Sequence, residues 1–178
     1  MKLLLHCCCA PCALSCVGQL CKDGIEPGLF WYNPNIHPYT EYSSRYSSLA
    51  EFAAEKNLKM QTLGGYGLKD FITAVFAQMA RPARCEICYG LRLEKTAAFA
   101  AENGYQAFST SLLGSPYQDH ETIRRFGEEA AAKYGITFFY SDFRACFYES
   151  KTAARSRGMY MQKYCGCIFS EEERYLKQ

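Results

Sequence analysis

Residues 2–24, KLLLHCCCAPCALSCVGQLCKDG, decide the fold of this chain. The apolar run Lys2–Leu5 is short and continuous, which is typical of a strand that is buried on both faces. Pro11 suits the first turn of a helix, because its missing N–H is not needed there. A helix is therefore predicted over Cys12–Lys22, ending before Gly24. A buried strand followed directly by a helix is the first half of a parallel β–α unit.

The rest of the chain repeats this alternation of strands and helices. Further strands are predicted at Gly28–Tyr32, Lys59–Leu63, Ala107–Leu112 and Ile136–Tyr140. Further helices are predicted at Thr40–Lys56, Lys69–Ala80, Tyr89–Asn103 and Asp119–Tyr134. The remainder, Phe143–Gln178, is predicted to be mostly helical, with interruptions near Gly158 and Gly166. We therefore expect one α/β domain over residues 1–178, with a mostly parallel five-stranded sheet, helices on both faces and a helical C-terminal part.

The unusual residues of the sequence follow the predicted strands. In open parallel sheets, ligands bind beyond the carboxyl ends of the strands. The cysteine run Cys7–Cys9 follows the first strand, Asn33-Pro34 the second, Gly114-Ser115 the fourth and Asp142 the fifth. The sequence thus predicts a functional site along one edge of the sheet.

Composition limits the classes of protein to consider. The chain is 49% hydrophobic and 21% charged, which indicates a globular protein. The formal net charge of +2 permits a nucleic-acid partner without requiring one. The start, MKLLLHCCC, is shorter than the apolar stretch of about 7–15 residues in a secretory signal. No apolar run reaches the roughly 18 residues of a membrane helix, so we expect a cytoplasmic protein without a membrane partner.

Eleven cysteines are present and they are grouped. In a reducing compartment, such grouping indicates metal binding or catalysis rather than structural disulfides. The four thiols of Cys8, Cys9, Cys85 and Cys88 match the ligand count of a 4Fe-4S cluster or of a four-cysteine zinc site. Cys7 is expected to point away from Cys8 and to pack in the core.

Two other functions remain open at this point. Cys9-Ala-Pro-Cys12 fits a thiol-disulfide oxidoreductase, because a helix N-terminus stabilises a thiolate. A non-catalytic zinc module that binds RNA is also compatible with four grouped cysteines. Cys165-Gly166-Cys167 would close a small, strained and easily reduced disulfide ring, which suits an electron relay. Alternatively, the two cysteines of this pair are thiols without a function, or they bind a metal.

Basic and aromatic residues alternate in the C-terminal part. Such a segment can contact phosphates and stack on unpaired bases, although a solvated helix face is about as common. The residues are Tyr148, Lys151, Arg155, Arg157, Tyr160, Lys163 and Tyr164. Arg81, Arg84 and Arg92 flank the second cysteine pair and add positive charge there. The Walker and G-x-G-x-x-G phosphate-binding motifs are absent from the sequence.

Taken together, five segments resemble the QueH family of cobalamin-independent epoxyqueuosine reductases. They are HCCCAPC at 6–12, RCEICYGLRL at 84–93, STSLLGSPYQDHE at 109–121, DFR at 142–144 and YMQKYCGCIFS at 160–170. The resemblance implies a Rossmann-like sheet of the HUP or PP-loop type. The S-G-G-x-D-S motif with which tRNA-thiolating enzymes of similar fold bind ATP is absent after the first strand.

The resemblance also implies an activity and a site. A 4Fe-4S cluster on Cys8, Cys9, Cys85 and Cys88, together with a redox-active disulfide between Cys165 and Cys167, would reduce epoxyqueuosine to queuosine at the wobble position of tRNA. The electrons would come from an unidentified donor. A Lewis-acidic iron for the epoxide oxygen needs an open position on the cluster or on a second iron ion. Asp142 or Tyr117 is expected to deliver the proton.

Overall fold

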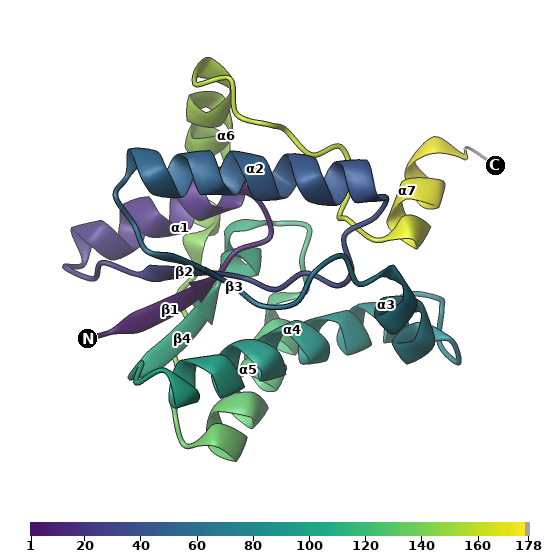
Figure 1. Cartoon of the computed structure of the whole chain (residues 1–178), viewed down its shortest axis with the longest axis horizontal. Coiled ribbons are helices and arrows are strands. Elements are labelled where there is room, and N and C mark those ends of the chain that lie inside the picture. The colour runs from purple at the N-terminus through teal and green to yellow at the C-terminus, as the bar shows by residue number, and fades with distance from the viewer. Residues whose placement is uncertain (177–178) are drawn as a thin grey trace.

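The computed structural model describes residues 1–176 and contains one five-stranded sheet in the order β3-β2-β1-β4-β5 (Figure 1). All neighbouring strands are parallel. The strands are β1 (Leu3–His6), β2 (Gly28–Trp31), β3 (Met60–Thr62), β4 (Ala107–Thr110) and β5 (Thr137–Phe138). The helices are α1 (Ala10–Lys22), α2 (Tyr39–Glu55), α3 (Leu68–Val75), α4 (Ala83–Glu102), α5 (His120–Tyr134), α6 (Phe147–Ser156) and α7 (Ile168–Tyr175). Two 3-10 turns, η1 (Ser111–Gly114) and η2 (Phe143–Cys146), complete the fold. The predicted α/β class with a parallel five-stranded sheet is confirmed; the single domain over 1–178 stays a prediction.

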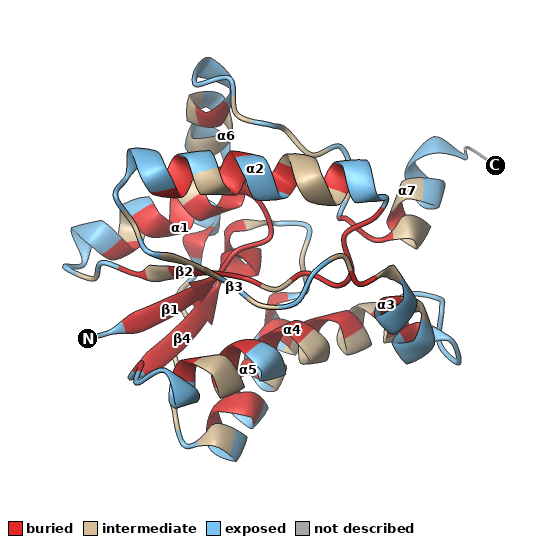
Figure 2. Ribbon diagram, viewed as in Figure 1, coloured by how far each residue is buried: buried red, intermediate tan, exposed pale blue. Residues whose placement is uncertain are grey.

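Strand β1 is the centre of the sheet because it pairs with β2 on one side and β4 on the other. Its three leucines are fully buried, as a central parallel strand covered on both faces requires. Figure 2 shows β1 and β4 as buried throughout.

Helices cover both faces of the sheet (Figure 1). Helix α1 contacts α2 and α6 in one layer, while α4 contacts β1, β4 and α5 in the other. The helices bury one side and expose the other (Figure 2). None of the helices within residues 1–176 is both long and apolar enough to cross a lipid bilayer.

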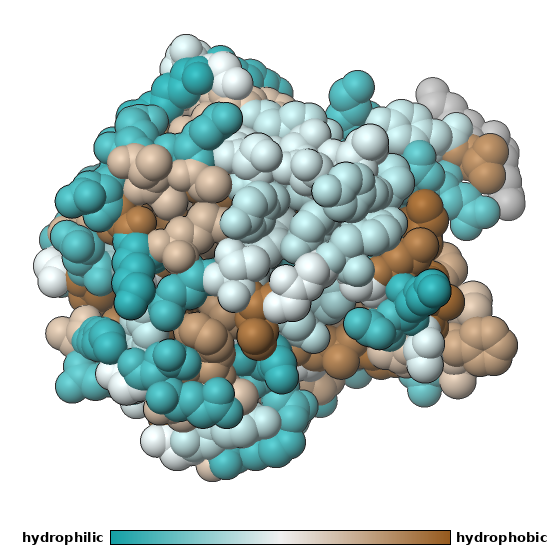
Figure 3. All heavy atoms as spheres, viewed as in Figure 1, coloured by the Kyte–Doolittle hydropathy of each residue, from teal (hydrophilic) through white to brown (hydrophobic). Residues whose placement is uncertain are grey.

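A second, smaller hydrophobic cluster joins α3, α4 and α7. Its buried members are Phe71, Val75, Cys88 and Cys167. Figure 3 shows hydrophobic side chains gathered near α3 and α7, beside a more polar surface over α2. This cluster brings the C-terminal Cys165–Cys167 segment against the helix that carries Cys85 and Cys88.

The structure differs from the prediction at two element boundaries that matter for the site. Helix α4 begins at Ala83, six residues before the predicted start, so Cys85 and Cys88 lie in its first turns. Strand β5 ends at Phe138, which leaves Asp142 four residues beyond it. In the C-terminal part the structure has one continuous break between the end of α6 at Ser156 and the start of α7 at Ile168, where two separate interruptions were predicted. Gly158 and Gly166 lie near the two ends of this break, with positive φ angles of 67° and 142°.

Candidate metal and redox site

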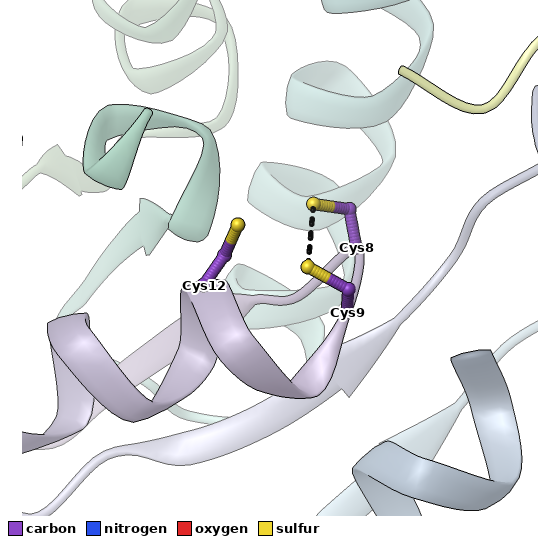
Figure 4. Close-up of side chains that lie close together, drawn as sticks. All are labelled: Cys8, Cys9 and Cys12. Carbon is purple, nitrogen blue, oxygen red and sulfur yellow. Dashed lines mark hydrogen bonds between the residues drawn. The ribbon is translucent and has the colours of Figure 1, made fainter. Parts of the chain in front are cut away.

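Three thiols meet where β1 passes into α1 (Figure 4). Cys8 lies in the connection, Cys9 is the residue that caps α1, and Cys12 lies in its first turn. Their Sγ atoms all lie within 4.8 Å of one another. A proline occupies the start of α1, as predicted, and thereby helps to fix this turn. The arrangement offers three sulfur ligands to one metal centre.

The three thiols differ in acidity. Hydrogen bonds from Cys12 and Cys9 hold the pKa of Cys8 well below its ordinary value. Hydrogen bonds with Cys12 and then with Cys8 raise the pKa of Cys9, and the hydrogen bond with Cys8 raises the pKa of Cys12. Cys8 is therefore the most acidic of the three thiols, and a bound metal would displace the thiol protons. Cys7 points elsewhere, as predicted: its thiol is fully buried and donates to the carbonyl oxygen of Leu5.

Buried hydrogen bonds fix this connection to the neighbouring strand ends. His6 at the end of β1 contacts Thr110 Oγ1 at 2.9 Å and Asn33 Oδ1 at 3.2 Å. The amide of Cys8 donates to Ser111 Oγ over 3.2 Å. Because the chain winds outward from β1 to β3 and then returns to β4, this is the point where the strand order reverses and where such sheets bind ligands.

A cavity of about 540 Å³ opens at this point. Six thiols line it: Cys8, Cys12, Cys85, Cys88, Cys165 and Cys167. Seven basic residues also line it: Arg45, Arg81, Arg84, Arg92, Lys151, Lys163 and Arg174. No aspartate or glutamate is among the lining residues of the described chain, 1–176. The cavity therefore combines soft metal ligands with a surface suited to anions.

Arg92 is a buried cation without a full set of partners. Its Nε donates to the carbonyl oxygen of Cys88 at 3.0 Å, while its Nη2 has no partner among residues 1–176. Burial alone would lower the pKa of Arg92, but Coulombic interaction with the neighbouring sulfur groups of Cys88, Cys165 and Cys8 raises it. An anionic, thiolate-ligated group in this cavity would give the free N–H a partner. The donor set therefore fits a metal–sulfur centre.

The segment with Cys165 and Cys167 is tied down from α2 and from the loop before it. Arg45 Nη1 donates to the carbonyl oxygen of Cys165 at 3.1 Å. The amide of His37 donates to the carbonyl oxygen of Gly166 at 2.8 Å. Gly166 has a φ of 142°, and a Cβ there would lie 3.3 Å from Ile36 Cγ1. Glycine is needed at this position for both reasons.

The structure gathers the predicted cysteines in two groups. Cys8 and Cys9 belong to the three-thiol group, whereas Cys85, Cys88, Cys165 and Cys167 lie on the other side of the cavity, among α4 and the C-terminal segment. Burial raises the pKa of Cys88 to about 12, and Cys165 and Cys167 add to this shift. The structure has all eleven cysteines as free thiols, so the predicted Cys165–Cys167 disulfide stays a prediction.

The two predicted proton donors lie in different places. Tyr117 lines the cavity and is 75% exposed. Asp142 is outside the lining among residues 1–176 and pairs with Arg144. The hydrogen bond from Arg144 lowers the pKa of Asp142 to about 2. An ionised carboxylate has no proton to donate at neutral pH, so Tyr117 is the better candidate for the proton donor.

Two site residues were missed in the sequence analysis. Gln162 Nε2 lies 3.0 Å from Cys9 Sγ and 3.7 Å from Cys12 Sγ, and its Oε1 has no partner among residues 1–176. Arg45 ties the C-terminal segment from the middle of α2. Cys12 was left out of the predicted ligand set, although its three-residue spacing from Cys9 indicated that the two thiols could lie together, because helix positions i and i+3 share a face. No local pattern marked Gln162 or Arg45.

Comparison with known proteins adds to this geometry. The profile of the family described as "Epoxyqueuosine reductase QueH" matches residues 3–173. A protein of Dehalococcoides mccartyi named "Epoxyqueuosine reductase QueH" is 38% identical, over 99% of this chain and 96% of its own length. A protein of the same name from Thermotoga maritima is 35% identical, over 97% of this chain and 91% of its own length.

The fold is also similar to that of a solved structure. A predicted subunit of tRNA methyltransferase from Methanocaldococcus jannaschii aligns with a TM-score of 0.55 over 98% of this chain and 93% of its own. At 14% identity, this likeness concerns the fold alone. The family profile and the two relatives, by contrast, span nearly all of the sequence. The chain belongs to the epoxyqueuosine reductase QueH family.

Proposed function

We propose that this protein reduces epoxyqueuosine in tRNA to queuosine, with a 4Fe-4S cluster and a redox-active pair of cysteines. The observation that carries the proposal is the cavity at the strand reversal, which six thiols and seven basic residues line without a carboxylate. Thiols there suit an iron–sulfur centre, and the positive charge suits a polyanionic substrate. The relatives named above carry the matching activity in their names.

Cys8, Cys9, Cys85 and Cys88 are the proposed ligands of the cluster. A cluster binds one cysteine at each of four irons, so its ligands can come from both sides of the cavity. When bound, it would supply electrons one at a time beside the substrate. Cys12 is the one thiol of the three-thiol group that is not among these four ligands, so it is available to bind a second iron ion.

Cys165 and Cys167 are the proposed two-electron store. Removing the epoxide oxygen as water takes two electrons and two protons, which is what a dithiol releases on closing to a disulfide. Both thiols line the cavity, and Arg45 and His37 fix the segment that carries them. An external electron donor would then reopen the disulfide. Such a cycle suits the reducing cytoplasm, where we place the protein.

The other residues of the cavity would bind and orient the substrate. Lys151 and Lys163 are placed to neutralise phosphates. Arg92 offers its free N–H to the anionic centre. Tyr117 is the proposed proton donor to the epoxide oxygen, because it lines the cavity and Asp142 does not.

The rival functions suit this site less well. A thiol-disulfide oxidoreductase needs an exposed nucleophilic thiolate of low pKa. Cys9 is only 1% exposed, and the pKa values of Cys9 and Cys12 are raised. A four-cysteine zinc module would leave the remaining thiols of the cavity without a role.

Metal analysis and a product assay test the proposal. Anaerobically purified protein should be brown, with about four iron and four sulfide per chain. Cys85→Ser and Cys88→Ser should lose colour and activity together, while Cys21→Ser, at the exposed end of α1, should keep both. With reductant and tRNA that carries epoxyqueuosine, mass analysis of the nucleosides should show queuosine. A colourless protein with one tightly bound zinc would contradict the proposal, and dithiol exchange without iron would favour the oxidoreductase.

A further inference from the structure

Three aromatic rings lie together beside the cavity, and two of them, Tyr117 and Phe147, line it. Tyr117, in the connection before α5, contacts Phe147 with ring centroids 5.8 Å apart. Phe147, the first residue of α6, contacts Tyr148 with centroids 5.3 Å apart. Tyr117 is 75% and Tyr148 73% exposed, so two large rings face solvent. We call Tyr117, Phe147 and Tyr148 the aromatic platform.

Positive charge accompanies the aromatic platform. Lys151 Nζ lies 5.3 Å from the centroid of the Phe147 ring, and Lys151 also lines the cavity. At about 100° per residue, Lys151 and Arg155 lie about 40° and 80° around α6 from Phe147, on the side between Phe147 and Tyr148. Glu149, the acidic residue of α6, lies about 200° from Phe147 and so on the opposite side.

Exposed rings beside cations are what a single-stranded nucleic acid requires. Bases stack on aromatic side chains, and neighbouring cations contact the phosphates. A platform beside the cavity would hold a base next to the nucleotide whose modified base enters the cavity. Packing alone does not account for two tyrosines that remain about three-quarters exposed.

We propose that the aromatic platform stacks an unpaired anticodon-loop base that neighbours the modified nucleotide, with Lys151 on the adjoining phosphate. The inference rests on the proposed function, because tRNA is the substrate there. It adds a binding surface that lies outside the thiol groups and requires no metal. Binding can therefore be measured apart from turnover.

The test uses an unmodified anticodon stem-loop RNA with 2-aminopurine beside the wobble position. Wild-type protein should bind it and quench the 2-aminopurine fluorescence. Tyr148→Ala and Tyr117→Ala should each weaken binding about 5-fold to 100-fold, the range expected for losing one base–aromatic stack, and reduce the quenching. Tyr148→Phe and Tyr117→Phe keep the rings and should bind like wild type. Lys151→Gln should lower affinity and reduce the dependence of log K on log[salt] by about one unit.

Two controls separate stacking from charge and from misfolding. Tyr39→Ala removes a ring that is 61% exposed but lies at the start of α2, outside the aromatic platform, and should leave affinity unchanged. A fully paired RNA duplex of equal length should bind wild type and the alanine variants alike, because it offers no unpaired base. Circular dichroism and iron content should match wild type in every variant.

The outcomes distinguish this inference from the proposed function. Unchanged affinity and quenching in both alanine variants would overturn the platform, even if the enzyme produces queuosine. Alanine variants that lose affinity for stem-loop and duplex equally would overturn it too. Ring-dependent quenching without any reduction of epoxyqueuosine would support the platform and contradict the proposed function.

Discussion

Arg45 reaches from the middle of α2 to the Cys165–Cys167 segment, where its Nη1 donates to the carbonyl oxygen of Cys165 over 3.1 Å. Its Nη2 donates to the carbonyl oxygen of Tyr164 at 2.9 Å, and its Nε pairs with Glu41 at 2.7 Å. One buried guanidinium therefore makes three directed contacts. The planar arrangement of these donors is the reason why arginine rather than lysine suits this position.

Arg45→Lys should loosen the segment that carries Cys165 while keeping the positive charge. A lysine ammonium cannot span both carbonyl oxygens and Glu41, and lost hydrogen bonds of a buried charge cost about 2 kcal/mol. We expect the free energy of unfolding in urea to fall by about that amount, and alkylation of Cys165 by iodoacetamide to accelerate. Arg157→Lys, which changes an exposed ion pair with Glu55, is the matched control and should shift stability by less than about 0.5 kcal/mol. Equal effects of the two substitutions would refute the role given to Arg45.

Gln162→Leu should lower the midpoint potential of the proposed iron–sulfur centre. Gln162 Nε2 lies 3.0 Å from Cys9 Sγ, and hydrogen bonds to ligand sulfurs favour the more negative, reduced state. The leucine keeps the approximate volume but donates no hydrogen bond. A spectroscopic redox titration would measure the shift, with the exposed Gln78→Leu as control. An unchanged potential would mean that Gln162 does not contact a ligand of the loaded centre.

Cys165 and Cys167 should react differently with disulfides in solution. Cys165 is exposed, whereas Cys167 is buried in the second hydrophobic cluster. Disulfide exchange depends on access to the sulfur that is attacked. Cys167→Ser should therefore accumulate a mixed disulfide at Cys165 when it is treated with oxidised glutathione, because the Cys165 thiolate attacks that disulfide and releases one glutathione thiol, and Cys165→Ser should not. Intact-protein mass spectrometry measures the adduct, and adducts of equal yield in both variants would contradict the assignment of Cys165 as the entry point.

The sheet and the edge that holds the site were predictable because their signals are local. The run Leu3–Leu5 has the continuous apolar character of a central strand, and the first cysteines follow it directly. The C-x-x-C spacing of Cys85 and Cys88 indicated a shared centre, although α4 was predicted to begin too late. Its first turn contains arginine, cysteine and glutamate, so the apolar periodicity that marks a helix starts only near Tyr89.

The parts that were not predictable depend on long-range contacts. Gln162 meets Cys9 across 153 positions of sequence and Arg45 meets Cys165 across 120, and no spacing rule covers either. Asp142 was placed on the rim because β5 was expected to continue to Tyr140. The strand ends at Phe138, and the following residues carry Asp142 to the start of η2, where it pairs with Arg144.

His37 should make the protein less stable in acid. Its Nδ1 accepts from the amide of Ile168 at 3.3 Å, while its Nε2 donates to the carbonyl oxygen of Pro34 at 2.9 Å. Burial lowers the pKa of His37 to about 4 from an ordinary 6.5. Protonation would turn Nδ1 from an acceptor into a donor facing the Ile168 N–H. The folded state therefore requires the neutral form of the ring, which fixes the segment next to Cys167 through its hydrogen bond with Ile168.

The sign follows from which state binds the proton first. Between pH 6.5 and about 4, His37 is protonated in the unfolded chain but not in the folded one. The contribution of His37 to stability is therefore fully present above pH 6.5 and is lost as the pH falls towards 4. Between pH 7 and pH 5 the expected loss from His37 is about 2 kcal/mol. His37→Gln keeps a donor and an acceptor but does not titrate. From pH 7 to pH 5 the free energy of unfolding in urea should therefore fall by about 2 kcal/mol less in the variant than in the wild type. His6, whose pKa is also lowered to about 4 by burial, is present in both proteins and cancels in the comparison. Identical pH profiles for the wild type and His37→Gln would show that His37 is not the group responsible.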